Sequence, residues 1–144
     1  MHRLETQIEI EAPIERVWAL LIDFPSHSRW DLFVRSIEGT LEVGQSLKVF
    51  IQPPDANGMQ FRPTVLAAEP NRELRWKGKL LLPGLFDGEH YFRLEEKPGG
   101  GITFHQGEVF SGILVPFFRR SLDGATKQGF VAMNEAIKRE AEKS

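Results

Sequence analysis

The sequence predicts a single α+β domain in which a curved antiparallel sheet wraps around a long C-terminal helix. Three observations lead to this prediction. Seven extended runs of residues follow one another with short connections, which is typical of an antiparallel meander. One amphipathic stretch, Val115–Lys143, is long enough to cover the apolar face of such a sheet. The length of 144 residues also fits one domain, spanning 1–144.

The first elements are one strand and two short helices. Polar and apolar residues alternate over Leu4–Glu11, which predicts a half-buried strand. Pro13 suits the first turn of a helix, and the spacing of the apolar side chains after it predicts a short helix over Pro13–Ile22. After a break at residues 23–26, a second short helical turn is expected over His27–Trp30.

Six more strands are expected before the long helix. Turns rich in Pro, Gly and Asn separate them, and an open meander of seven strands twists and curls. The predicted strands are Phe33–Gly39, Gln45–Gln52, Met59–Glu69, Glu73–Leu81, Phe86–Lys97 and Ile102–Ser111. Two glycines in the final helix, Gly124 and Gly129, indicate either its close approach to the sheet, the favoured interpretation, or room for a ligand.

Composition and charge exclude several classes of function. The formal net charge is −2 and the Lys and Arg residues are scattered, so nucleic-acid binding has little electrostatic support. The chain has no cysteine, which excludes disulfides, zinc–thiolate sites and thiol catalysis. No apolar run approaches the ~20 residues of a membrane-spanning helix, and the N-terminus does not read as a signal peptide. A cytoplasmic location is therefore the default expectation.

Strand alternation predicts which side chains face the interior. In the strand Phe86–Lys97, the polar residues Glu89, Tyr91, Arg93 and Glu95 share the wet face, so their neighbours point inward. An apolar cavity with a few polar groups is the usual form of a small-molecule site. The predicted ligand-contacting residues are Trp30, Phe33, Trp76, His90, Phe92, Phe104, Gln106, Glu108, Phe110, Phe118, Leu122 and Met133. The alternative for their aromatic members is plain core packing.

His90 and Glu108 are the candidate catalytic residues. An inward carboxylate is costly to bury unless it is paired, protonated or solvated, so Glu108 is either a polar anchor or base, or a rim residue that reaches water, Arg119 or Arg120. For His90 the alternative is a hydrogen-bonded core histidine. No metal is expected, because His105 and Glu108 fall on opposite faces of one strand.

Four segments carry a resemblance to a known superfamily. They are IEIEAPIERVWALLIDFPSHSRWDLFV, TVLAAEPNRELRWKG, GEHYFRLEE and GITFHQGEVFSGILVPFF, and together they run in order over essentially the whole chain. On these motifs the chain resembles the START-like, Bet v 1-like (SRPBCC) superfamily, and within it the polyketide cyclase/dehydrase-like group. The resemblance implies a helix-grip fold with a deep pocket between the sheet and the long helix. Its members include lipid and hormone carriers and aromatic cyclases, so the fold does not settle the function.

Three functions stand as alternatives. The leading hypothesis is binding of a small, largely apolar ligand, such as a lipid, isoprenoid or polyketide-like aromatic. The second is a metal-free enzyme of the cyclase or dehydratase type, in which His90 and Glu108 supply acid–base groups. The third is a protein-interaction module, for example a homodimer, that uses an edge strand or the apolar loop Leu80–Phe86, which is alternatively a lid or a core plug. No cofactor is expected.

Overall fold

The computed structural model of the protein describes residues 1–80 and 84–143. The middle of the Leu80–Phe86 loop, with its predicted role as lid, plug or interaction surface, lies outside the described residues. The helices are α1 (Ile14–Ile22), α2 (His27–Trp30), α3 (Val115–Ser121) and α4 (Lys127–Ala141). The strands are β1 (His2–Ile10), β2 (Val34–Glu38), β3 (Lys48–Ile51), β4 (Met59–Phe61), β5 (Thr64–Glu69), β6 (Glu73–Leu80), β7 (Phe86–Glu96) and β8 (Ile102–Ser111).

The predicted fold class is confirmed, although the sheet is divided differently. Five strands form one antiparallel sheet in the order β1-β8-β7-β6-β5, and β2-β3-β4 form a smaller one. The predicted strand Met59–Glu69 is two strands, β4 and β5, because Pro63 between them has no N–H to donate to a ladder. The two sheets stay joined by backbone hydrogen bonds, among them one of 2.9 Å from the Leu47 N–H to the Pro63 carbonyl.

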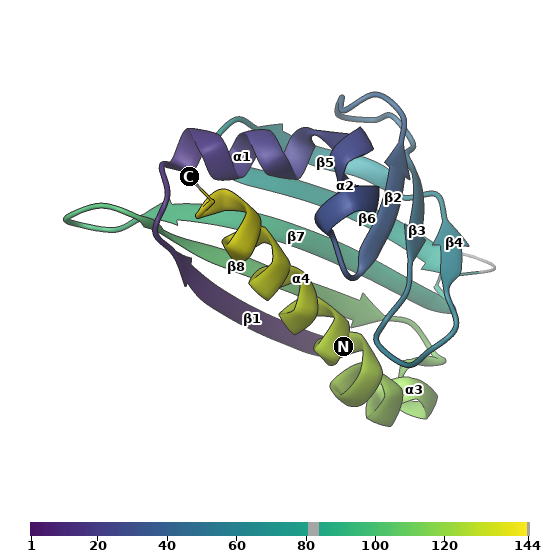
Figure 1. The fold of residues 1–144 in the computed structure, drawn as a ribbon. Helices are drawn as coiled ribbons and strands as arrows, with labels where there is room; N and C mark the ends of the chain where they lie inside the picture. Colours follow the sequence, from purple (N-terminus) through teal and green to yellow (C-terminus); the bar gives the residue numbers. More distant parts are fainter. Residues whose placement is uncertain (81–83, 144) are drawn as a thin grey trace.

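The C-terminal helix crosses the concave face of the five-stranded sheet (Figure 1). The predicted helix Val115–Lys143 corresponds to α3, a π-helical segment at Leu122–Thr126, and α4, which follow one another directly. At Gly129 the helix packs closely against Phe33, since a Cβ there would lie 2.4 Å from the Phe33 ring. A side chain at this position would therefore push α4 away from the segment between α2 and β2.

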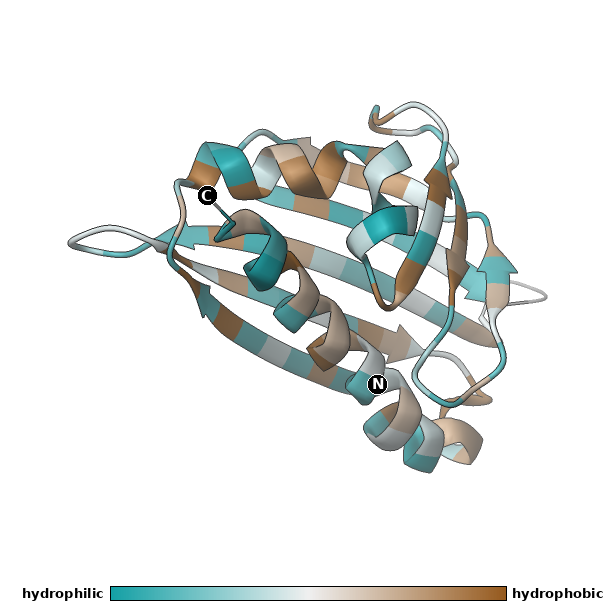
Figure 2. Ribbon diagram, in the orientation of Figure 1, coloured by the Kyte–Doolittle hydropathy of each residue, from teal (hydrophilic) through white to brown (hydrophobic). Residues whose placement is uncertain are grey.

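The core lies between this helix and the sheet. Along the strands, hydrophobic and hydrophilic residues alternate as the sequence predicts (Figure 2). The inward residues Trp76, Phe92 and Phe104 are at most 2% exposed, and Phe130 on α4 is fully buried among them. Helix α1 adds Val17 and Leu21 to the same core. One continuous hydrophobic core thus joins the two sheets, α1 and α4.

An ion pair fastens α2 to the end of α4, and it makes a testable contribution to stability. Nη1 of Arg29 lies 2.5 Å from Oε1 of Glu140. This hydrogen bond, and a second from Lys143, lower the pKa of the Glu140 carboxyl below its ordinary value of 4.5. A lowered folded-state pKa stabilises the fold above the unfolded-state pKa, and the contribution is lost as the pH falls through the folded-state pKa.

We expect Arg29→Gln to lower the free energy of unfolding by about 0.5 kcal/mol at neutral pH, because Arg29 is largely exposed and solvent screens the pair. The difference from wild type should shrink as the pH falls through the lowered folded-state pKa of Glu140, because the carboxyl then becomes protonated and loses its attraction to Arg29. Urea unfolding at neutral pH and near pH 3 measures this. An equal difference at both pH values would contradict the assignment.

Candidate functional site

A cavity of about 270 Å³ lies between the concave face of the large sheet, the small sheet and the start of the C-terminal helix. Its walls are mainly aromatic and aliphatic side chains. Met59 and Phe118 stand at its rim with 44% and 43% of their surface exposed. The cavity therefore opens to solvent between β4 and α3.

Seven of the twelve predicted ligand-contacting residues line this cavity. They are Phe33, Trp76, His90, Glu108, Phe110, Phe118 and Leu122. The other five lie elsewhere. Phe92, Phe104 and Met133 are buried core residues, and Gln106 is buried behind His90. Trp30 packs on His27 with 4.7 Å between ring centroids and donates to the Ser26 hydroxyl, so it anchors the short helices.

The remaining lining residues were not predicted from the sequence. They are Val34, Ile51, Met59, Phe61, Gly78, Lys79, Phe86, Gly88, Ser121 and Thr126. Strand alternation places three of them on inward faces, because Phe86 and Gly88 alternate with the polar residues of β7 as His90 does, and Gly78 follows Trp76 on β6. Most of the others come from the small sheet, from the end of α3 and from the π-helical segment, whose positions over the large sheet no local pattern reveals.

His90 and Glu108 form the ionisable part of the cavity wall. They occupy directly paired positions on β7 and β8, with 2.9 Å between Nδ1 of His90 and Oε1 of Glu108. Their side chains are only 4% and 17% exposed. The His90 ring stacks on Trp76 at 5.5 Å between centroids. Among the described residues Glu108 has no ion pair with Arg119 or Arg120, the partners that the sequence had allowed.

Glycine at position 88 makes room for the Glu108 carboxylate. A Cβ there would lie 2.1 Å from Oε2 of Glu108. Gly88 is the neighbour of Phe110 in the β7–β8 ladder, next to the His90–Glu108 pair. Oε2 of Glu108 therefore lies over the bare backbone of Gly88, at the cavity wall that both residues form.

A chain of hydrogen bonds holds the His90 ring through Nε2, the ring nitrogen that does not face Glu108. Its Nε2 lies 3.0 Å from Oε1 of Gln106, a residue that is fully buried. The Gln106 amide donates to Oδ1 of Asn134 at 2.8 Å and to the Phe130 carbonyl at 3.3 Å. Asn134 in turn donates to the Thr6 hydroxyl at 2.9 Å. This network ties the His90 ring to α4 and β1, so its position in the cavity wall is fixed.

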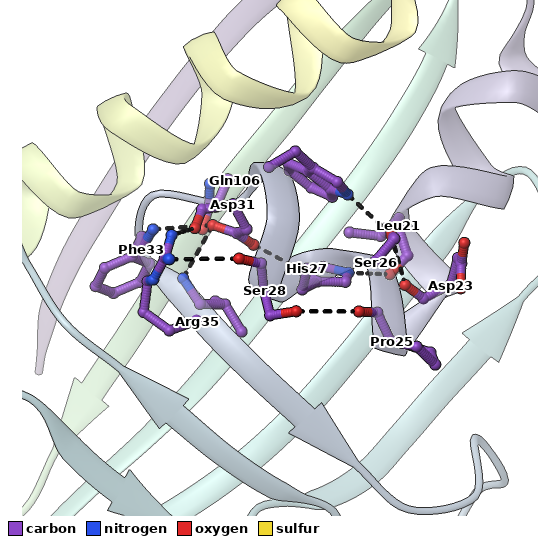
Figure 3. A network of polar contacts seen from close by, with 12 residues as sticks. Leu21, Asp23, Pro25, Ser26, His27, Ser28, Asp31, Phe33, Arg35 and Gln106 are labelled. Atoms are coloured by element: carbon purple, nitrogen blue, oxygen red, sulfur yellow. Dashed lines mark hydrogen bonds and ion pairs between the residues drawn. The ribbon is translucent and has the colours of Figure 1, made fainter.

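A second buried histidine pair, which the sequence reasoning missed, holds the cavity's other wall (Figure 3). Nδ1 of His27 lies 2.8 Å from Oδ2 of Asp31, and both side chains are fully buried. His27 also bonds to the Leu21 carbonyl at 2.8 Å through Nε2. The backbone N–H groups of Phe33 and Val34, two cavity residues, donate to Oδ1 of Asp31 at 2.9 and 3.0 Å. The i, i+4 spacing on a short helix was the available signal.

The outer face of the large sheet has a second hollow, of about 500 Å³, with a different character. Its lining includes Arg3, Glu5, Arg75, Tyr91 and Arg93. Partial burial, and then the nearby Glu5 carboxylate, raise the pKa of the Tyr91 phenol, which stays protonated at neutral pH. Charged and polar side chains make up most of the lining of this hollow, so the inner cavity is the better candidate for an apolar ligand.

Neither a metal-binding cluster nor a membrane-spanning helix is found in the part of the chain that the structure describes. Within 1–80 and 84–143, no three His, Asp or Glu side chains lie close enough together to hold a metal ion. His105 points away from the cavity and lies 3.1 Å from Glu95. None of the helices in the described part of the chain is long and apolar enough to cross a membrane.

Solved structures with a similar fold include one that this chain matches over nearly its whole length and di-domain proteins that it matches over about half. Protein MLL2253 from Mesorhizobium loti has a TM-score of 0.73 at 23% identity, over 96% of this chain and 95% of that one. The di-domain ARO/CYC BexL from the BE-7585A biosynthetic pathway has a TM-score of 0.75 at 15% identity. The match covers 99% of this chain but 50% of BexL.

A further di-domain protein has the same relation to this chain. The ARO/CYC StfQ from the steffimycin biosynthetic pathway has a TM-score of 0.76 at 12% identity, over 97% of this chain and 50% of StfQ. At these identities the likeness shows the fold alone. The comparison with curated proteins returned no match. The family model described as polyketide cyclase / dehydrase and lipid transport matches residues 1–142, and the chain therefore belongs to that family.

Proposed function

We propose that this protein binds a small, largely apolar ligand in the inner cavity, of the lipid, isoprenoid or polyketide-like aromatic class. The observation that carries the proposal is a cavity with aromatic walls and a single buried ionisable pair. The family description covers both polyketide cyclases or dehydrases and lipid transport, which supports this range of ligands.

The size and shape of the cavity favour the compact members of that range. A volume of about 270 Å³ is at the lower end of common ligand pockets, which begin at roughly 300 Å³. Trp76, Phe86, Phe110 and Phe118 supply ring faces and edges around it. Such walls suit a flat aromatic molecule or one short isoprenoid chain better than a lipid with two acyl chains.

Native mass spectrometry of the freshly purified protein, followed by solvent extraction, tests the proposal. We expect a co-purified apolar molecule, or uptake of a neutral apolar fluorophore such as N-phenyl-1-naphthylamine at a one-to-one ratio. An empty protein that also takes up no such probe would contradict the proposal.

Two adjacent phenylalanines on α3 give a matched pair of variants. Phe118 lines the cavity and contacts Phe86 with 5.3 Å between ring centroids, whereas Phe117 points to solvent and is 79% exposed. We expect Phe118→Ala to weaken binding of N-phenyl-1-naphthylamine by on the order of tenfold, the value of about one aromatic contact. Phe117→Ala should bind as wild type does. Fluorescence titration measures both, and equal losses would place the probe outside the cavity.

The second candidate function is a metal-free cyclase or dehydratase. The observation that favours it is the His90–Glu108 pair at the cavity wall, where an acid–base group would reach a bound substrate. Glu108→Gln keeps the shape of the side chain but cannot exchange a proton. If turnover of a polyketide-like substrate is detected, this variant should lose it while still binding the substrate. Unchanged turnover would exclude Glu108 as the base.

A further inference from the structure

The orientation of the Gln106 side-chain amide is fixed by its neighbours. One end of the amide faces the backbone carbonyl of Phe130, which can only accept a hydrogen bond, so this end must be the NH₂ group. The NH₂ group also donates to Oδ1 of Asn134. The carbonyl oxygen of Gln106 is therefore the atom that faces Nε2 of His90, at 3.0 Å.

This orientation sets the proton on His90. Because the Gln106 oxygen can only accept, Nε2 of His90 must carry a hydrogen. The opposite ring nitrogen, Nδ1, faces Oε1 of Glu108 at 2.9 Å, and one proton must lie between these two atoms for the contact to be favourable. The pair is either an imidazolium with a carboxylate or a neutral imidazole with a carboxylic acid whose proton points at His90.

The second carboxyl oxygen of Glu108 is a hydrogen-bond acceptor in both forms. In the ionised form Oε2 carries no proton, and in the neutral form the proton lies on Oε1, between the two residues. Among residues 1–80 and 84–143, no group donates to Oε2. It lies over Gly88 at the cavity wall, where a bound molecule can reach it. Oε2 is thus an acceptor without a donor at the largely apolar cavity wall, whereas the hydroxyls of Ser121 and Thr126, which also line the cavity, can donate as well as accept.

We propose that the cavity selects an apolar ligand with a hydrogen-bond donor, such as a phenol, enol or alcohol, whose proton Oε2 of Glu108 accepts. This inference rests on the proposed ligand-binding function and names the polar group that the ligand carries. A carboxylate or phosphate would place its own acceptor oxygens against Oε2, which is unfavourable. Lys79 also lines the cavity, and its side chain is exposed at the rim.

Three ligands on one ring system test the inference on the wild-type protein. They are 2-naphthol, which has the donor, 2-methoxynaphthalene, which lacks it, and 2-naphthoate, which is an anion. A hydrogen bond to a charged group contributes about 1.5–3 kcal/mol. We therefore expect 2-naphthol to bind about 10- to 100-fold more tightly than 2-methoxynaphthalene in isothermal titration calorimetry. The anion should bind more weakly than 2-naphthol.

Two substitutions of Glu108 assign the preference to its oxygen. In Glu108→Gln, the amide can donate to Nδ1 of His90 and leave its oxygen facing the cavity, so most of the preference for 2-naphthol should remain. In Glu108→Leu the acceptor is lost, and the two neutral ligands should bind within about threefold of each other. Binding of 2-methoxynaphthalene to both variants reports that the cavity is intact.

The possible outcomes separate this inference from the function on which it rests. If none of the three compounds binds to the wild-type protein, the ligand-binding function itself is contradicted. If 2-naphthol and 2-methoxynaphthalene bind equally, the cavity binds apolar molecules but Glu108 does not select a donor. If 2-naphthoate binds best, the inference is overturned, and the cavity instead selects an anionic ligand that Lys79 binds at the rim. A preference that persists in Glu108→Leu would assign the acceptor to another group.

Discussion

Asp31→Ala is expected to lower the free energy of unfolding by about 3–5 kcal/mol, a large effect for one side chain. The substitution leaves the fully buried His27 without its partner, and it removes the acceptor of the Phe33 and Val34 N–H groups. Figure 3 shows that this one carboxylate joins α2 to the start of β2. Since Phe33 and Val34 line the cavity, binding of N-phenyl-1-naphthylamine should weaken as well.

Asp31→Asn separates the loss of charge from the loss of hydrogen bonds. Its oxygen can still accept from the Phe33 and Val34 N–H groups, and its NH₂ can donate to Nδ1 of a neutral His27. The Leu21 carbonyl keeps the hydrogen on Nε2 of His27. We therefore expect a loss of only about 1 kcal/mol for Asn. Urea unfolding of the two variants measures the difference, and equal losses would show that the buried charge, not the hydrogen-bonding pattern, stabilises this region.

Gln106→Leu should lower the free energy of unfolding by about 3 kcal/mol, although leucine fills a similar volume. The change removes the acceptor of His90 and the donor to Asn134, and an unpaired buried polar group costs about 1–3 kcal/mol. Gln128→Leu is the matched control, because Gln128 is exposed on α4 and its replacement should change stability by at most about 0.5 kcal/mol.

A double variant tests whether Gln106 and Asn134 act as one network. Replacing both partners by apolar groups can cost less than the sum of the single losses, because fewer polar groups are left unpaired. We expect Gln106→Leu with Asn134→Leu to be more stable than additivity predicts by at least about 1 kcal/mol. Additive losses, or a single loss no larger than that of Gln128→Leu, would show that the network does not stabilise the fold.

The two histidine networks have related roles in the proposed function. Asp31 and His27 hold the backbone that carries Phe33 and Val34, and Gln106 holds the ring of His90. Both therefore fix cavity-lining residues by buried hydrogen bonds. A ligand site whose walls are held in this way needs little rearrangement on binding, which reduces the entropy cost of association.

The sequence predicted the inward face of the strands well, because side chains alternate with a strict period of two. His90, Gln106 and Glu108 were all placed on the concave face, and all three belong to the observed hydrogen-bond chain. It could not predict that His90 contacts Glu108 rather than Arg119 or Arg120. That contact depends on the register of β7 against β8, where His90 and Glu108 are paired directly.

By itself, the sequence determined the fold class, the long C-terminal helix and the inward face of each long strand, because periodic patterns of apolar residues record which side of an element is buried. The tertiary structure decided the cavity and its chemistry. Because one predicted strand breaks at Pro63, the small sheet forms one wall of the cavity. Between this sheet, the large sheet and the start of the C-terminal helix remains a space of about 270 Å³. Such a space is set by distances between packed elements, and no local pattern of residues encodes those distances.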